Sequence, residues 1–172
     1  SPTELGNEFF GDMYLEADSP DEFRKAVRKQ YQKGADWIKV MGTGAVMNPG
    51  AEPGQVILEE EELKAICDMA RFVNLPVSVH CHGSEGIKMC IRNGVREHSS
   101  IMDDECLRMY KSTDRSFMIP TLSAPHAFLE MSEGMPKHYV DKAARIVRIL
   151  DEGMREAYRQ GIKMGWGTDA GV

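Results

Sequence analysis

The 172-residue chain lacks the features that mark several large classes of protein. Its four cysteines form no CxxC pair and fall short of the density of a secreted disulfide scaffold. No apolar run approaches the length of a membrane span, and the first residues lack a signal-peptide pattern. The net charge of −6, with acidic and basic residues interleaved, gives no nucleic-acid footprint. We therefore expect a cytoplasmic protein with reduced core cysteines that binds neither nucleic acid nor a membrane.

Two nucleotide-binding motifs are also missing. No glycine-rich fingerprint follows a predicted strand, and the pattern GxxxxGK[ST] does not occur. These absences disfavour a nucleotide site. The composition, 42% hydrophobic and 28% charged, is instead that of an ordinary globular domain with a substantial core.

Helix and strand signals alternate along the chain after a first loop, residues 1–18. Ser19, Pro20 and Glu22 form a helix-start signature, and glycines end several predicted helices. The predicted helices cover residues 20–33, 59–74, 84–93, 103–113 and 137–160, and the predicted strands cover residues 36–41, 77–83, 95–99, 117–122 and 162–171. Two loops rich in glycine or proline, at 42–54 and 125–136, interrupt this alternation.

This alternation predicts an α/β fold with a parallel sheet and helices outside it. Five strands suit either an open doubly wound sheet or part of a closed barrel. In both folds, ligands bind at the carboxyl ends of the strands, so polar residues there are the candidates for chemistry.

Residues 77–83 carry the clearest of these candidates. Strand residues alternate faces, so His80 and His82 project to one side of the strand, while Val77, Val79 and Cys81 project to the other. Two imidazoles on one face suit metal ligands or acid–base groups. A pair of hydrogen-bonded structural histidines explains the pattern equally well.

Three other predicted strands end with polar residues, which are Lys39, His98 and Asp169. Each has an ordinary explanation by itself: a lysine that snorkels outward, a buried histidine and a turn-forming aspartate. Their coincidence with His80 at equivalent positions is harder to explain this way. Imidazoles and a carboxylate that converge from separate strands suit zinc or a similar divalent ion.

Lys39 needs a separate argument, because an ammonium ion beside a dication is strongly disfavoured. A neutral amine, however, adds carbon dioxide to form a carbamate, which is a carboxylate on a long arm. Such a group can bridge two metal ions about 3.5–4 Å apart. We therefore hypothesise that Lys39 is carboxylated.

Five segments of the chain closely resemble the amidohydrolase superfamily, and in particular its imidazolonepropionase-like and Xaa-Pro or Xaa-Arg dipeptidase branch. These segments are residues 35–41, 44–50, 79–87, 97–98 and 167–171. The resemblance implies a TIM (β/α)8 barrel of the metal-dependent hydrolase type. The family's first-strand HxH motif is absent from the chain, so residues 1–172 correspond to the C-terminal part of one barrel, strands 4–8 with their helices.

The resemblance also implies the roles of the site residues. Lys39 corresponds to the carboxylated lysine, and His80 and His98 correspond to metal ligands, for one or two zinc-like ions. Asp169 corresponds to the aspartate that binds metal and accepts the proton of the attacking water. We assign His82 to the catalytic surroundings, as a support for the ligands or a substrate contact.

The function that follows is hydrolysis of an amide or peptide bond, in a dipeptide or N-acyl amino acid, by a metal-activated hydroxide. Two alternatives remain open. One is a cyclic amidase that opens an imidazolone- or hydantoin-like ring, and the other is a catalytically incomplete barrel fragment. A partial barrel exposes sheet edges, so we expect a homo-oligomer or association with the missing part of the barrel.

Overall fold

A computed structural model describes residues 15–44, 54–97 and 101–168 of the chain. Its sheet consists of three short parallel strands, β1 (Ile38–Met41), β2 (Val77–His80) and β3 (Arg96–Glu97). They lie in the order β1-β2-β3, which is also their order along the chain.

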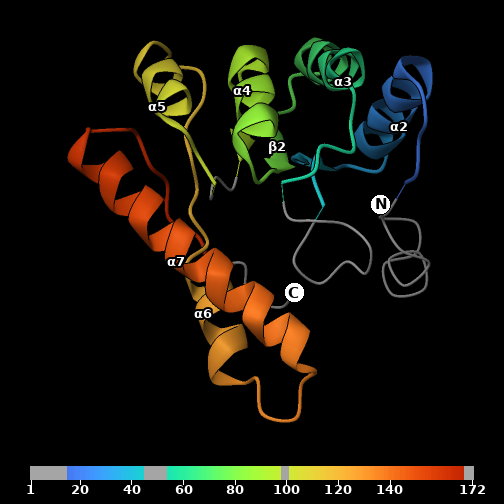
Figure 1. Ribbon diagram of the computed structural model, residues 1–172. Coiled ribbons are helices and arrows are strands. Elements are labelled where there is room, and N and C mark those ends of the chain that lie inside the picture. Colours follow the sequence, from blue (N-terminus) through green and yellow to red (C-terminus); the bar gives the residue numbers. More distant parts are fainter. Residues whose placement is uncertain (1–14, 45–53, 98–100, 169–172) are drawn as a thin grey trace.

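Six helices accompany this sheet in the described part of the chain. They are α2 (Pro20–Gln32), α3 (Glu60–Phe72), α4 (Ser84–Asn93), α5 (Asp104–Lys111), α6 (Ser123–Glu130) and α7 (Lys137–Arg159). Helices α2, α3, α4 and α5 stand in a row beside the strands, whereas α6 and α7 pair with each other (Figure 1). None of these helices combines the length and the apolar character needed to cross a bilayer.

The sequential strand order bears on the two folds that the sequence allowed. A doubly wound sheet reverses its strand order and has helices on both faces. Here each strand pairs with the next one along the chain, and the helices that follow the strands line up on one side (Figure 1). This is the local arrangement of a (β/α) barrel, and it also matches one half of a doubly wound sheet.

Several predicted helix ends are confirmed, because they depend on local chemistry. The Ser19 hydroxyl accepts a hydrogen bond from the Glu22 N–H at 3.3 Å, and the Glu22 carboxylate accepts one from the Asp18 N–H at 2.8 Å. Helix α4 ends at Gly94, which has φ +70° in the left-handed region. Capping groups and glycine therefore define these boundaries as the sequence predicted.

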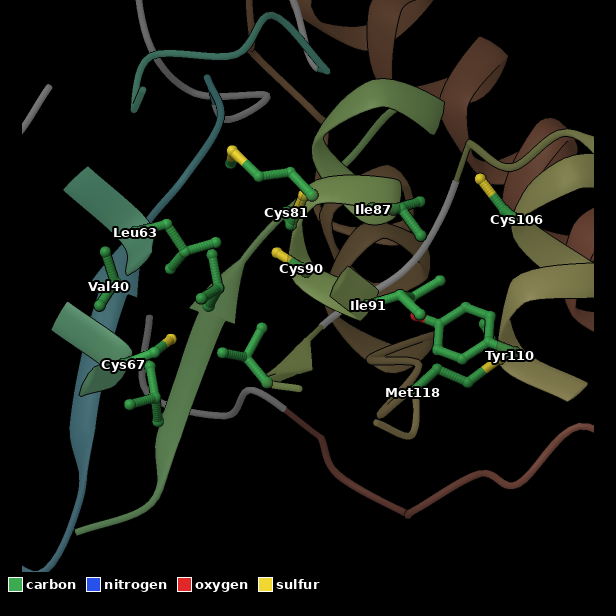
Figure 2. Packing of buried hydrophobic residues seen from close by; sticks show 14 of the residues in the cluster. Val40, Leu63, Cys67, Cys81, Ile87, Cys90, Ile91, Cys106, Tyr110 and Met118 are labelled. Atoms are coloured by element: carbon green, nitrogen blue, oxygen red, sulfur yellow. The ribbon is translucent and has the colours of Figure 1, made fainter. Parts of the chain in front are cut away.

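The core lies between the strands and the row of helices. Leu63 and Ile66 of α3, Val79 of β2 and Ile87 of α4 are essentially inaccessible to solvent. All four cysteines are also buried in this core and form no disulfide (Figure 2); they are Cys67, Cys81, Cys90 and Cys106. Burial raises the pKa of the Cys67 thiol to about 12 and that of Cys106 to about 11, so both thiols stay protonated at neutral pH.

The prediction of five strands was only partly right. Residues 117–122 and 162–168 contribute a single parallel bridge, between Met118 and Met164, rather than two full strands. The Met118 N–H donates to the Lys163 carbonyl at 3.3 Å, and the Gly165 N–H donates to the Met118 carbonyl at 2.7 Å. Pro120 has no N–H to donate to a ladder, so this pair stays short. The last residues of that predicted strand, 169–171, lie outside the described part.

The predicted loop at 125–136 was also partly wrong, because it contains most of α6. Pro125 lies in the first turn of α6, where the missing N–H breaks no helical hydrogen bond. Two long-range bonds hold this helix in place. The Ser123 hydroxyl donates to the Thr168 carbonyl at 2.8 Å, and His126 Nε2 lies 3.0 Å from Asp151 Oδ1 of α7. Tertiary contacts therefore stabilise a helix that has no capping signal in the sequence.

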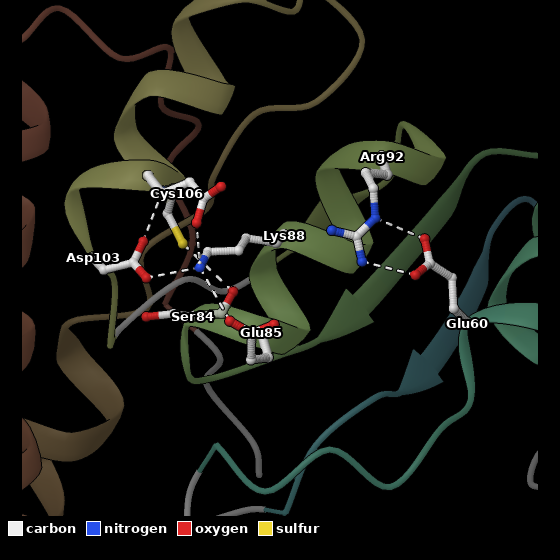
Figure 3. A network of polar contacts seen from close by, with 8 residues as sticks. Glu60, Ser84, Glu85, Lys88, Arg92, Asp103 and Cys106 are labelled. Carbon is white, nitrogen blue, oxygen red and sulfur yellow. Dashed lines mark hydrogen bonds and ion pairs between the residues drawn. The ribbon is translucent and has the colours of Figure 1, made fainter.

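A network of ion pairs joins neighbouring helices (Figure 3). The Lys88 ammonium of α4 lies 3.0 Å from Glu85, 2.9 Å from Asp103 and 2.7 Å from Glu105, so it links α4 to the start of α5. A bidentate pair between Arg92 and Glu60, with both N···O distances 2.7 Å, links α4 to α3 in the same way. These ion pairs connect α4 to its two neighbouring helices, α3 and α5.

The network gives stability a defined pH dependence. The Lys88 ammonium, with the Cys106 N–H, holds the pKa of Asp103 below its usual range. A carboxylate with a lowered folded-state pKa stabilises the fold above its unfolded pKa of about 4, and this contribution is lost as the pH falls further. Asp103→Asn retains a capping oxygen but removes the charge. We expect it to cost about 0.5–1 kcal/mol at pH 7, because Asp103 is partly solvent-screened.

Urea unfolding of wild type and Asp103→Asn at pH 7 and at pH 3 measures this effect. The stability difference between the two proteins should shrink at pH 3. A difference that is equal at both pH values would contradict the ion-pair explanation.

Candidate metal centre

Strands β1 and β2 direct one set of side chains into the helical core and the other to the open face of the sheet. Ile38 and Val40 of β1 are buried, and the intervening Lys39 is exposed. In β2, Val77 and Val79 are buried, and His80 is only partly buried. The alternation predicted for β2 is confirmed. Lys39 and His80 therefore lie on the same face of adjacent strands.

Lys39 is not at the end of its strand, as the sequence suggested, but is the second residue of β1. The register aligns Lys39 with Ser78 and Met41 with His80. The backbone of Lys39 therefore lies level with Ser78, two residues before His80, which is about 6.6 Å along the strand direction. A lysine side chain has four methylene groups, which is enough to span this distance. The position suits a long side chain that reaches toward the histidine.

The two histidines contact each other directly. Their ring centroids are 4.5 Å apart with an interplanar angle of 85°, an edge-to-face arrangement. His80 is the last residue of β2, and its Nε2 atom is buried. His82 follows the strand and is partly buried. The structure therefore brings together the two imidazoles that the sequence pattern predicted.

The His82 ring is held neutral by its surroundings. Removal of the ring from bulk water, together with the nearby charges of His80 and Lys39, lowers the pKa of His82 to about 3. A neutral imidazole is the form that binds a metal or accepts a proton.

Short backbone contacts fix the turn that carries the histidines. The His80 carbonyl accepts a hydrogen bond from the Gly42 N–H at 2.9 Å. The His82 N–H donates to the hydroxyl of Thr43, a fully buried residue, also at 2.9 Å. Sequence reasoning missed Thr43, because no local pattern predicts a bond across 39 residues.

The other two predicted ligands, His98 and Asp169, lie outside the described residues, so their predicted roles remain predictions. The same applies to residues 45–53 of the glycine-rich loop. Within the ranges that the structure does describe, no group of three or more histidine, cysteine, aspartate or glutamate side chains converges.

His80, His82 and Lys39 can together bind a divalent ion only if the charge of Lys39 is removed or reversed. The buried Nε2 of His80 and the neutral ring of His82 have the right chemistry for zinc-like ions. An unmodified Lys39 ammonium does not, since its charge opposes a dication. Carboxylation reverses that charge: the amine and carbon dioxide give a carbamate anion and a proton. The donor set therefore fits a metal if Lys39 is carboxylated.

Comparison with known proteins adds an independent line of evidence. A sequence model of the amidohydrolase family matches residues 3–172. Ochratoxinase from Aspergillus niger is 34% identical over 156 residues, which cover 89% of this chain and 32% of that protein. The chain thus spans about a third of the length of the curated relatives it matches.

Solved structures agree with this match. A Xaa-Pro dipeptidase with bound methionine superposes with a TM-score of 0.81 and 34% identity, over 91% of this chain and 39% of that one. A prolidase complexed with N-methylphosphonate-L-proline gives a TM-score of 0.80 and 30% identity, over 88% of this chain and 38% of that one. The match to the family model extends over nearly every residue, and the chain belongs to the amidohydrolase family.

Proposed function

We propose that the protein is a metal-dependent hydrolase that cleaves the amide or peptide bond of a dipeptide or N-acyl amino acid. The observation that carries the proposal is the placement of Lys39 and His80 on the same face of adjacent strands, with the His82 ring edge-to-face against His80. The matches to a Xaa-Pro dipeptidase and to ochratoxinase support amide hydrolysis as the reaction class.

In this proposal Lys39, as its carbamate, binds one or two zinc-like ions together with His80, His98 and Asp169. A divalent ion held there supplies polarisation of the amide carbonyl and activation of water for attack. The chain itself supplies the proton transfer: Asp169 accepts the proton of the attacking water and passes it to the leaving nitrogen. His82 contacts the substrate or orients the ligand beside it. The loop at 42–54 and the segment at 125–136 select the substrate.

The proposed partners follow from the free edge of the sheet. Within the described ranges β1 pairs with β2 alone, and a cleft of about 580 Å³ runs beside β1, lined by β1, α2 and residues 15–18 and 57–58. We propose that the remaining barrel strands, or a second copy of the chain, cover this edge. The four buried cysteines, which form no disulfide with one another, support a proposed cytoplasmic location.

Hydrolysis of a panel of dipeptides and N-acyl amino acids, with zinc added to the purified protein, tests the reaction. We expect turnover, and we expect Asp169→Asn to lower kcat by about 100-fold, because a positioned acid–base group contributes 10²–10⁴-fold. Asp114→Asn, which disrupts the remote pair with Lys163, is the control and should retain full activity.

Undiminished activity of Asp169→Asn would remove this residue from the proposal. Opening of hydantoin-like rings by a protein that leaves every dipeptide intact would assign a cyclic amidase instead. No turnover of any amide by zinc-loaded protein would contradict hydrolase activity altogether.

A further inference from the structure

Strand β1 separates from β2 just beyond the level of His80, the last residue of β2. The last ladder bond between them runs from the Gly42 N–H to the His80 carbonyl, at 2.9 Å. Beyond it, residues 42–44 turn away and pair with residues 55–57, through an antiparallel bridge between Thr43 and Val56. We call residues 42–44 and 54–57 the neck, because they flank residues 45–53 in the sequence.

The separation removes the acceptor that the next ladder bond would use. In a continuing parallel ladder the His82 N–H would donate to the Gly42 carbonyl. That carbonyl instead accepts from the Ile57 N–H at 3.1 Å, within the neck. The Thr43 hydroxyl takes its place and accepts from the His82 N–H at 2.9 Å. A side chain thus continues the ladder where the backbone has left it.

Packing holds this hydroxyl in position. Thr43 is fully buried, and its methyl group fills a notch at Gly86, where an added Cβ would lie 2.9 Å from Thr43 Cγ2. Gly54, on the other strand of the neck, packs closely against Gly83, the residue after His82. A Cβ on Gly54 would lie 3.1 Å from the Gly83 Cα. The neck therefore contacts residues His82 and Gly83 through both Thr43 and Gly54.

We propose that Thr43 is a positioning residue for the metal centre, which sets the backbone of His82, and with it the edge-to-face contact with His80, through its hydroxyl group. This inference rests on the proposed metal-dependent function. It also makes the neck a link between the end of β1 and the two histidines at the end of β2.

Two substitutions separate the hydroxyl from the methyl group. Thr43→Val keeps the shape and removes the acceptor, and Thr43→Ser keeps the acceptor and removes the methyl group. Thr113→Val is the matched control, since the Thr113 hydroxyl accepts from the Arg115 N–H at 3.1 Å in the turn after α5. The measurements are hydrogen exchange of the His82 amide and zinc affinity by chelator competition, both on the purified protein.

We expect Thr43→Val to speed exchange of the His82 amide and to weaken zinc binding about 10-fold, the effect typical of lost outer-shell support. Thr43→Ser should stay within about twofold of wild type in both, and Thr113→Val should match wild type. Unchanged exchange in Thr43→Val would overturn the proposal. So would equal defects in Thr43→Ser and Thr43→Val, which would assign the effect to packing alone.

The same measurements distinguish a failure of the proposed function from a failure of the proposed role of Thr43. If wild-type protein binds no zinc, the metal-dependent function fails, and the exchange measurement still decides whether Thr43 sets the His82 backbone.

Discussion

Lys39→Met is expected to lower amide hydrolysis by about 10³-fold and to abolish binding of at least one zinc ion. The carbamate is the only anionic ligand that strand β1 can offer on the open face, since its same-face neighbour Met41 has no donor of that kind. Loss of a metal worth several kcal/mol of transition-state stabilisation corresponds to a factor of this size. Metal content per chain and kcat of the purified protein measure it.

The control for this prediction is Lys163→Met. Lys163 precedes Asp169 in the chain, is exposed, and forms an ion pair with Asp114. Its loss should leave both metal content and kcat unchanged. Lys39→Arg keeps a positive charge and cannot form the same carbamate, so it should be as inactive as Lys39→Met. Activity in Lys39→Arg close to wild type would refute the carbamate hypothesis.

Gly83→Ala is expected to destabilise the protein by about 3 kcal/mol or more. Gly83 has φ +83° and ψ 143°, a conformation that is essentially restricted to glycine. A Cβ at this position would also lie 2.9 Å from the backbone of Gly54, which cannot move without the neck. Backbone strain and a clash against backbone therefore add together at the residue that follows His82.

Gly34→Ala separates these two causes. Gly34 has nearly the same φ, +84°, but a Cβ there meets nothing within 4 Å. It should cost about 1 kcal/mol, from backbone strain alone. Urea unfolding of the two variants measures the difference. Equal costs would show that the contact between Gly54 and Gly83 is not tight.

The sequence predicted those parts of the fold that depend on neighbouring residues. Ser19 and Asp103 cap helices through their own side chains, and Gly94 ends α4, so three helix boundaries could be placed closely. The alternation in β2 likewise placed His80 on the open face of the sheet.

Features that depend on distant contacts could not be predicted in this way. The apolar stretch at 117–122 resembles a strand, but a strand needs partners, and here only Met118 finds one. Helix α6 starts after Leu122, which offers no capping side chain, and it is held by bonds from Ser123 and His126 to distant residues. Thr43 is a third case, since its acceptor role arises only because β1 leaves the sheet.

A crystal structure of the zinc-loaded protein, with anomalous scattering recorded at the zinc edge, tests the central claim most directly. The account predicts a zinc peak about 2.0–2.1 Å from an imidazole nitrogen of His80, with His98 and Asp169 around the same metal centre and carboxyl density on the Lys39 amine. A bare Lys39 amine, no zinc at His80, or His98 and Asp169 at the opposite end of the strands would contradict it.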